Sequence, residues 1–176
     1  KVLMLVSRFP YPLDKGDKLR AYHQLKELSK DFDVTLVTLT DHSVSHASIS
    51  EVQKVCNNLI VLKLNLLTKA FNMISCLLGP KPIQVGYFYS KKAQKKINKV
   101  IAQGEFQHIY CQLIRTSEYI KDQHHISKTI DYMDALSMGI ERRIELQAFH
   151  KKWLFKLEAK RLKNYERYIF DYFENH

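Results

Sequence analysis

The chain has 176 residues, of which 45% are apolar and 26% charged, and it carries a net charge of +10 at pH 7. These values suit one soluble globular domain with a sizeable core and exclude a disordered chain. The basic excess indicates an anionic partner: a nucleic acid, an anionic membrane surface or a phosphorylated small molecule. The three cysteines are widely spaced and form no zinc-binding pattern, so we expect a reducing, cytoplasmic environment.

The first forty residues predict a βαβ unit of a parallel sheet. Two apolar runs, Val2–Val6 and Val34–Leu39, are typical of strands covered on both faces, and Asp17–Lys30 has leucines at helical spacing. The loop between the first strand and this helix, Ser7–Lys15, is longer than most connections of its kind. Because parallel sheets bind ligands beyond the carboxyl ends of their strands, we expect this loop to contribute to a functional site.

The turn from this loop into the helix carries the strongest functional signal. Lys15, Gly16, Asp17, Lys18 and Arg20 stand where the helix begins. A helix N-terminus presents free N–H groups and partial positive charge, so we predict a site for phosphate or diphosphate here. A solvated basic turn is the alternative interpretation. The pattern is neither the G-x-G-x-x-G of dinucleotide-binding folds nor a P-loop, so neither of those sites is expected.

The segment between residues 40 and 64 contains no expected site. Thr40–Ser50 is polar and is interpreted as a loop, so the pair His42 and His46, which lacks a carboxylate partner, is not expected to bind metal. A short helix is expected to begin at Ser50, and the apolar run Leu59–Leu64 predicts a third strand.

A strongly apolar segment, Leu66–Leu78, comes next and is ended by Gly79 and Pro80. Its 13 residues are too few to cross a bilayer, which takes about 20. We expect a helix buried in the core. The alternative is a helix that contacts lipid or enters a membrane interface.

The following segment, Pro80–Gly104, has six lysines and no acidic residue, and it is predicted to be helical from Ser90 onward. Its apolar residues recur on one side of that helix and its lysines surround the other. A basic helix beside an apolar one suits an anionic membrane surface, and a simply solvated face is the alternative. The lysines expected to face the membrane are Lys91, Lys92, Lys95, Lys96 and Lys99.

Two further strands, His108–Leu113 and Lys128–Tyr132, are expected to extend the sheet, with a helix over Thr116–Asp122 between them. In a parallel sheet they deliver polar side chains to the edge that also holds the first turn. These side chains are Gln112, Arg115, Asp131 and Asp134. For Asp134, capping of the next helix is the alternative role.

The remaining residues, Arg142–Phe173, predict a long amphipathic helical region rich in basic and aromatic side chains. Its apolar residues recur near helical spacing and are expected to be mostly core: Trp153, Leu154, Leu157, Leu162, Tyr165, Ile169 and Phe173. No internal repeat or linker interrupts the chain. We therefore predict one α/β domain with a mainly parallel sheet of five or six strands and helices on both faces.

Three stretches of the sequence carry a resemblance to a known family. They are RFPYPLDKGDKLRAYHQLKELSKDFDVTLVTL, LLGPKPIQVGYFYSKKAQKKI, and DYMDALSMGIERR with the helix ending KRLKNYERYIFDYF. They are spread along nearly the whole chain and resemble the N-terminal domain of family-4-type glycosyltransferases of the GT-B fold. Within that group they are most similar to bacterial sugar transferases associated with exopolysaccharide and exosortase systems.

The resemblance implies a Rossmann-like three-layer domain, one half of a GT-B enzyme, that binds the acceptor. A C-terminal domain outside this chain would grip a nucleotide-diphosphate sugar, so the isolated domain is expected to be inactive. The residues expected to face the donor diphosphate are Lys15, Gly16, Asp17, Lys18 and Arg20. Those expected on the acceptor side are Gln112, Arg115, Asp131 and Asp134. The reaction implied is retaining sugar transfer in cell-surface polysaccharide synthesis, without metal or other cofactor.

Two positions depart from the family pattern. Lys15 precedes Gly16 where many relatives have two glycines, and Gln112 and Arg115 stand where many have a histidine, so catalytic residues are not assigned. The expected partners are the nucleotide-diphosphate sugar, a glycan or lipid-linked acceptor and the inner face of an anionic membrane, not nucleic acid. Two other functions fit the same residues: a nucleotide-sugar epimerase, and a basic membrane- or anion-binding module without catalysis.

Overall fold

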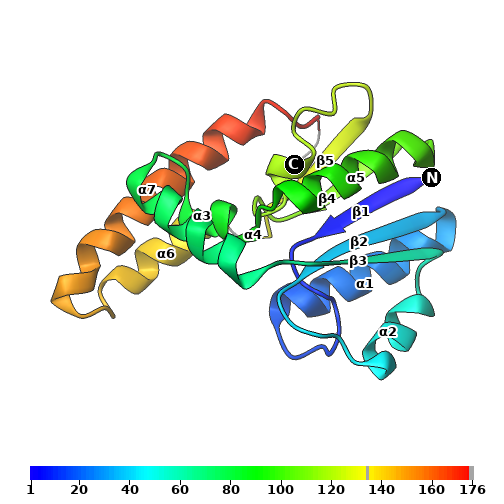
Figure 1. Cartoon of the computed structure of the whole chain (residues 1–176), viewed down its shortest axis with the longest axis horizontal. Coiled ribbons are helices and arrows are strands. Elements are labelled where there is room, and N and C mark those ends of the chain that lie inside the picture. Colours follow the sequence, from blue (N-terminus) through cyan, green and yellow to red (C-terminus); the bar gives the residue numbers. More distant parts are fainter. Residues whose placement is uncertain (134, 175–176) are drawn as a thin grey trace.

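The computed structural model describes residues 1–133 and 135–174 and has an α/β architecture (Figure 1). One sheet of five parallel strands has the order β3-β2-β1-β4-β5. The strands are β1 (Val2–Val6), β2 (Val34–Thr40), β3 (Asn58–Lys63), β4 (His108–Gln112) and β5 (Ser127–Asp131). The helices are α1 (Gly16–Asp31), α2 (His46–Gln53), α3 (Leu66–Leu78), α4 (Ile83–Phe88), α5 (Lys91–Gly104), α6 (Leu136–Ile144) and α7 (Phe149–Phe170).

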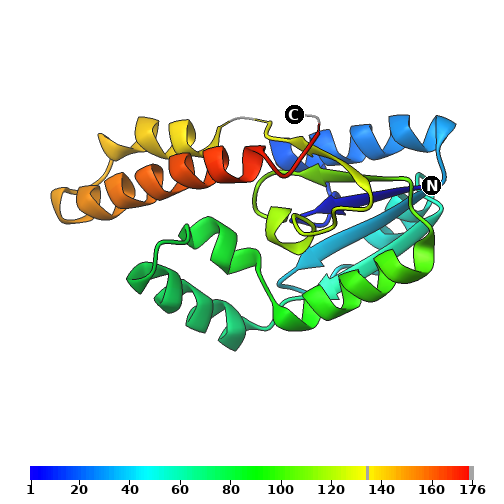
Figure 2. The same ribbon diagram turned by 90° about the horizontal axis from the view of Figure 1, so that it is seen from above.

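The predicted fold class is confirmed, and the helices form a layer on each face of the sheet. Figure 2 shows α1 and α5 on opposite sides of the strands. Alternate residues of the central strand β1 enter the two cores, because successive side chains of a strand point to opposite faces. Met4 packs with Leu25 of α1, whereas Leu5 belongs to the cluster that contains Ile97 of α5 and Ile169 of α7.

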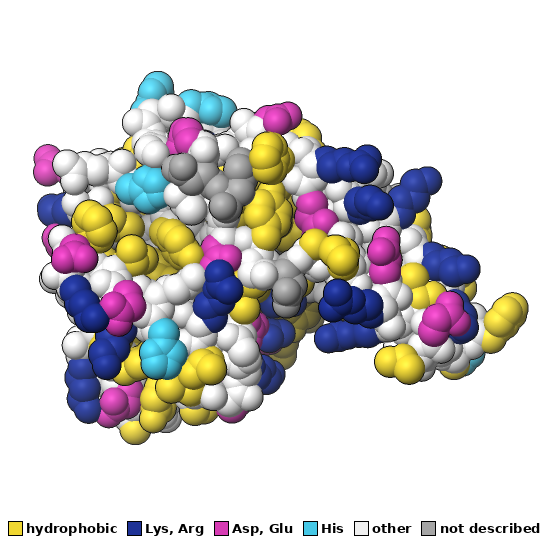
Figure 3. Space-filling model, turned by 180° about the vertical axis from the view of Figure 1, so that it is seen from behind, with side chains coloured by type: hydrophobic (Ala, Val, Ile, Leu, Met, Phe, Trp, Pro, Cys, Tyr) yellow, Lys and Arg dark blue, Asp and Glu magenta, His cyan; other side chains and the backbone are white. Residues whose placement is uncertain are grey.

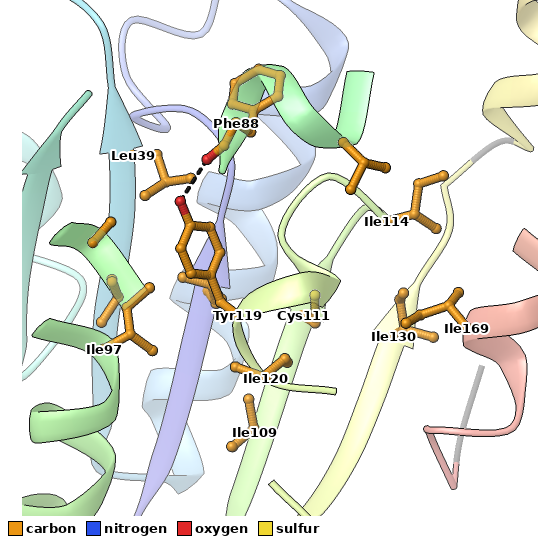
Figure 4. Close-up of a cluster of buried hydrophobic side chains, with 14 of the residues drawn as sticks. Leu39, Phe88, Ile97, Ile109, Cys111, Ile114, Tyr119, Ile120, Ile130 and Ile169 are labelled. Atoms are coloured by element: carbon orange, nitrogen blue, oxygen red, sulfur yellow. Dashed lines mark hydrogen bonds between the residues drawn. The ribbon is translucent and has the colours of Figure 1, made fainter. Parts of the chain in front are cut away.

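Tyr119 lies in the core between the sheet and helices α5 and α7 and contacts several of its segments (Figure 4). Its ring is fully buried, and its hydroxyl donates to the Phe88 carbonyl at 2.6 Å and accepts from the Ser90 N–H at 2.8 Å. These two hydrogen bonds satisfy backbone groups at the junction of α4 and α5, where helical bonding is interrupted. The connection after β4 therefore fixes the position of α4.

Two helix pairs, α3–α4 and α6–α7, extend beyond the carboxyl ends of the strands (Figures 1 and 2). Helix α7 holds the first pair by its ends. The Glu158 carboxylate accepts from the N–H groups of Ile83 and Gln84, at 3.0 and 3.1 Å, at the start of α4. Arg161 donates to the carbonyls of Cys76 and Leu77, at 2.8 and 3.2 Å, at the end of α3. Each charge meets the helix end whose dipole it complements.

The prediction that Leu66–Leu78 is a buried helix is wrong. The helix has the predicted bounds, but only Lys69 and Cys76 are buried along it, while Leu67 and Leu78 are 80% and 85% exposed. The segment is apolar, as its sequence indicates, but α3 extends past the sheet edge, and no other element among residues 1–133 and 135–174 covers its outer side.

The helix predicted over Thr116–Asp122 is only a 3-10 turn, Ser117–Tyr119. The Thr116 hydroxyl lies 3.3 Å from two preceding carbonyls and the Ser117 hydroxyl donates to Ile114 O at 2.8 Å, and such bonds compete with helical ones.

Two helix boundaries also differ from the predictions. The helix expected from Ser50 begins at His46, where the Ser45 hydroxyl caps it by accepting from the Ser48 N–H at 3.1 Å. The short helix α4 was not expected at all.

The region predicted as one long basic-aromatic helix is broken at residues 145–148 into parts of α6 and α7. Leu162, Tyr165, Ile169 and Phe173 are buried as predicted, but Trp153 is 61% exposed. Figure 3 shows why: the α6–α7 pair projects from the body, with basic side chains along it and hydrophobic side chains at its end.

Candidate functional site

The sheet has a switch point between β1 and β4. From β1 the chain passes through α1 to β2 on one flank, and from β4 it passes to β5 on the other. Connections that diverge in this way leave a crevice beyond the carboxyl ends of the two strands. The prediction that the first turn shares this edge with Gln112 and Arg115 is confirmed by the parallel pairing of β1 and β4.

A pocket of about 240 Å³ opens at this edge, beside the ends of β1 and β2. Arg8, Lys15 and Lys18 give it a basic side, and aromatic side chains including Tyr87 and Phe88 give it an apolar one. Gly16, the first residue of α1, has open space where a side chain would project. The N-terminal turn of α1 is thus accessible next to three cations.

Asp17 sits between two arginines at the switch point. Its carboxylate lies 2.8 Å from Arg8 Nη1 and 3.6 Å from Arg115 Nη1, and its other oxygen accepts from the Lys18 N–H at 3.0 Å. The Arg115 guanidinium also donates to Gln84 Oε1 at 3.0 Å and lies over the Phe88 ring. Burial, helped by the charge of Arg8, lowers the pKa of Arg115 to about 10, so it stays charged at neutral pH.

Asp131, at the end of β5, is a structural hub. Its two oxygens accept five hydrogen bonds: two from Arg20, one each from the side chains of Gln24 and Tyr110, and one from the Met133 N–H. Burial alone would raise the pKa of Asp131, but these hydrogen bonds and the charge of Arg20 lower it below its usual value. The carboxylate is ionised at neutral pH and joins β5 to α1 and β4.

A third carboxylate at this edge, Asp41, was not predicted. It directly follows β2 and accepts from Lys69 Nζ at 2.7 Å and from the Tyr87 hydroxyl at 3.0 Å, while His42 Nδ1 lies 2.7 Å away. The hydrogen bond from Lys69 is the main cause that lowers the pKa of Asp41 far below its usual value. Asp41 lines the pocket, and the edge rule that singled out Asp131 on β5 applies equally to the end of β2.

The residues predicted to face the donor diphosphate divide between two places. Lys15 and Lys18 line the pocket, and Lys18 also donates to Asp14 at 2.8 Å. Arg20 instead forms a bidentate pair with Asp131, with bonds of 2.9 and 3.0 Å. Arg8, which was not predicted, takes the place beside the lysines.

The residues predicted for the acceptor side lie next to this cluster. Gln112 is buried and its amide lies 3.3 Å from the Asp17 carbonyl and 3.4 Å from Gln24 Oε1. Arg115 and Asp131 lie at the same edge, whereas Asp134 lies outside the described residues. The five lysines predicted to face a membrane, Lys91, Lys92, Lys95, Lys96 and Lys99, are all exposed on α5.

The backbone is strained just beyond the two strands that carry Gln112 and Asp131. Leu113 and Met133 have φ angles of 66° and 59°, in the left-handed region that side chains other than glycine's rarely adopt. Each costs about 1–2 kcal/mol, and such residues concentrate at functional sites. Both are held here by Asp131, through its carbonyl and its carboxylate.

No protein-family model, curated protein or solved structure matches the chain. Within residues 1–133 and 135–174, no helix is long and apolar enough to cross a membrane. The same residues hold no group of three or more His, Cys, Asp or Glu side chains arranged for a metal ion. Function must therefore be inferred from the pocket and its charges.

Proposed function

We propose that this chain is the acceptor-side domain of a retaining glycosyltransferase. The enzyme transfers a sugar from a nucleotide-diphosphate sugar to a glycan or lipid-linked acceptor in cell-surface polysaccharide synthesis. The observation that carries the proposal is the basic pocket at the carboxyl edge of β1, where Arg8, Lys15 and Lys18 meet. These residues belong to the stretch with the most specific family resemblance, RFPYPLDKGDK.

The pocket supplies what the departure of a diphosphate requires. Negative charge grows on the nucleoside diphosphate as the bond between its phosphate oxygen and the anomeric carbon of the sugar breaks, and fixed positive groups stabilise that charge. Lys15, Lys18 and the N–H groups at the start of α1 provide such groups, and the open space at Gly16 lets phosphate approach them. The donor itself is held mainly by a second domain in a longer chain.

The ion pairs next to the pocket form its acceptor side. Asp17 neutralises part of the charge of Arg8 and Arg115. The two ion pairs also hold both guanidinium groups beside the crevice. Asp131, with five donors and a lowered pKa, is a poor proton acceptor at neutral pH, so its role is to position Arg20 and Tyr110.

The anion site is tested on the chain alone by calorimetric titration with inorganic pyrophosphate. The double variant Lys15→Gln/Lys18→Gln is expected to weaken binding at least about tenfold, because two charge-assisted contacts are lost. Lys26→Gln/Lys30→Gln removes the same charge from exposed positions further along α1 and should leave binding unchanged. Equal losses in the two variants would mean that the attraction is diffuse and the pocket is not a phosphate site.

The reaction is tested in the full-length enzyme by product analysis. A new glycosidic bond supports sugar transfer, whereas free epimerised sugar supports an epimerase and no product supports a binding module. In the transferase, Gly16→Ala and Lys18→Ala should each lower kcat/KM, and an unchanged value in both would overturn the role of this turn.

A further inference from the structure

The apolar side of helix α3 faces outward. Its apolar stripe, with one residue per helical turn, points away from the protein: Leu67, Phe71, Ile74 and Leu78 are 80%, 72%, 62% and 85% exposed. A surface helix normally turns such a stripe inward and its polar residues outward. Contiguous apolar surface of this kind marks an interaction site.

Polar contacts hold the helix in this orientation. Lys69, which is 4% exposed, donates to Asp41 at 2.7 Å. One turn on, the Asn72 amide donates to the carbonyls of Gly86 and Tyr89 at 3.1 and 2.7 Å. A rotation that buried the apolar stripe would break all three hydrogen bonds, so the exposed stripe is a built feature of the fold.

The segment that carries this stripe is strongly basic. Helices α3 and α5 follow one another along the same side of the molecule (Figures 1 and 2). Residues 52–104, which contain both helices, include nine lysines and no aspartate or glutamate. The outward side of α5 carries five exposed lysines, and its inward side buries Ala93, Ile97 and Ile101.

A groove of about 560 Å³ lies between the start of α3 and the start of α5. Lys63 and Lys92 line it together with Ser90, Asn65 and Leu66. The Asp41 carboxylate also lines the groove, but it is paired with Lys69 Nζ at 2.7 Å. The ammonium groups of Lys63 and Lys92, next to the exposed Leu66, therefore suit a phosphate attached to an apolar chain.

We propose that the α3–α5 face docks on an anionic lipid bilayer. α3 lies in the plane of the interface with Leu67, Phe71, Ile74 and Leu78 in the acyl region, because 13 residues span only about 20 Å. The α5 lysines contact the charged headgroups, and one headgroup phosphate occupies the groove between Lys63 and Lys92. Lipid is favoured over a protein partner because the face pairs an apolar stripe with the five exposed lysines of α5.

Docking in this way brings the pocket to the bilayer. Lys69 on α3 and Tyr87 on α4 both bond to Asp41, which lines the pocket at the ends of β1 and β2. A ligand anchored in the membrane would therefore meet the pocket at the surface on which α3 rests. The docking proposal stands independently of sugar transfer, since vesicle binding requires no activity.

Vesicle co-sedimentation tests the proposal with phosphatidylcholine vesicles, with and without phosphatidylglycerol. The chain should bind the anionic vesicles and lose at least about tenfold in partitioning in Leu67→Gln/Phe71→Gln, because two apolar side chains no longer enter the acyl region. Lys95→Gln/Lys99→Gln should lose about tenfold on anionic vesicles only. Binding that ignores phosphatidylglycerol would overturn the proposal.

Matched variants on the α6–α7 pair serve as controls. Phe149→Gln/Trp153→Gln and Lys156→Gln/Lys160→Gln change equally exposed side chains, and both should bind like the wild type. All eight positions are exposed, so the fold is expected to persist. If the controls lose as much binding as the α3 and α5 variants, adhesion is generic and the proposed face is wrong.

The only tryptophan, Trp153, offers an independent readout. Moving it onto the stripe, in Phe71→Trp/Trp153→Phe, should give a blue shift in fluorescence when anionic vesicles are added, whereas wild-type emission should not change. Sedimentation without lipid tests whether the stripe instead joins two copies of the chain. If the chain self-associates and Leu67→Gln/Phe71→Gln returns it to a monomer, the stripe joins two copies and docking on lipid is refuted.

Discussion

Helices α3 and α5 have nearly the same length, 13 and 14 residues, and both are amphipathic, but they face opposite ways. α5 buries Ala93, Ile97 and Ile101 against the sheet and exposes its lysines. α3 buries Lys69 and exposes leucines and a phenylalanine. The difference shows that an amphipathic pattern defines two sides of a helix, whereas the surrounding contacts decide which side faces inward.

The two helices are also held by different forces. Apolar burial fixes α5, whereas α3 is held mainly by polar contacts: Lys69 with Asp41, Asn72 with α4, and Arg161 with the end of the helix. Polar contacts of this kind are individually worth about 0.5–1.5 kcal/mol, so we expect α3 to open more readily than α5.

The largest contrast should come from the same substitution in each helix. Ile97→Ala in α5 removes a fully buried side chain and should lower the free energy of unfolding by about 2–5 kcal/mol. Ile74→Ala in α3 removes a side chain that is 62% exposed and should change it by less than about 0.5 kcal/mol. Urea denaturation measures both, and comparable losses would show that α3 is packed against something in solution.

A smaller effect is expected when the anchor of α3 is cut. Lys69→Met should cost about 1–2 kcal/mol at pH 7, because Asp41 loses its main hydrogen-bond donor. The folded-state pKa of Asp41 is lowered, so its stabilisation is complete above its unfolded pKa of about 4 and is lost as the pH falls further. The difference between wild type and variant should therefore shrink below about pH 4. The exposed Lys91→Met is the control and should show no such pH dependence.

The smallest effect concerns the contact between α7 and the end of α3. Arg161→Ala should cost about 0.5–1 kcal/mol, because the last carbonyls of α3 lose a cationic donor. Hydrogen exchange should become faster in α3 and stay unchanged in α5. The neighbouring exposed Lys160→Ala should alter neither helix, and faster exchange in α5 as well would contradict the separate anchoring of the two.

The strands were predictable because their composition alone identifies them. Val2–Val6 and Val34–Thr40 are buried at every position, as a parallel strand covered on both faces requires, and their apolar runs are visible in the sequence. The short helix α4 was not predictable, because its first N–H groups are satisfied by Glu158, more than 70 residues later. A local pattern contains no trace of such a cap.

The sequence predicts those residues of the candidate site whose location depends only on their position at the end of a strand. Gln112, Arg115 and Asp131 were placed at the correct edge because each lies at, or just after, the carboxyl end of a parallel strand. Which cation pairs with which carboxylate was not predictable. Arg20 was grouped with Lys18, yet one lies beside β5 and the other lines the pocket, because helical spacing places them on different sides of α1.

The central position of β1 has a consequence for the newly made chain. Val2 pairs with Val34 on one side and with His108 on the other, so the two partners of β1 are made at very different times. At a synthesis rate of about 5–20 residues per second, β4 is completed roughly 5–20 s after β1. Throughout that interval one edge of an entirely apolar strand stays open. This unpaired edge of β1 is therefore the strand edge most exposed to aggregation during translation, and we expect chaperones to bind there.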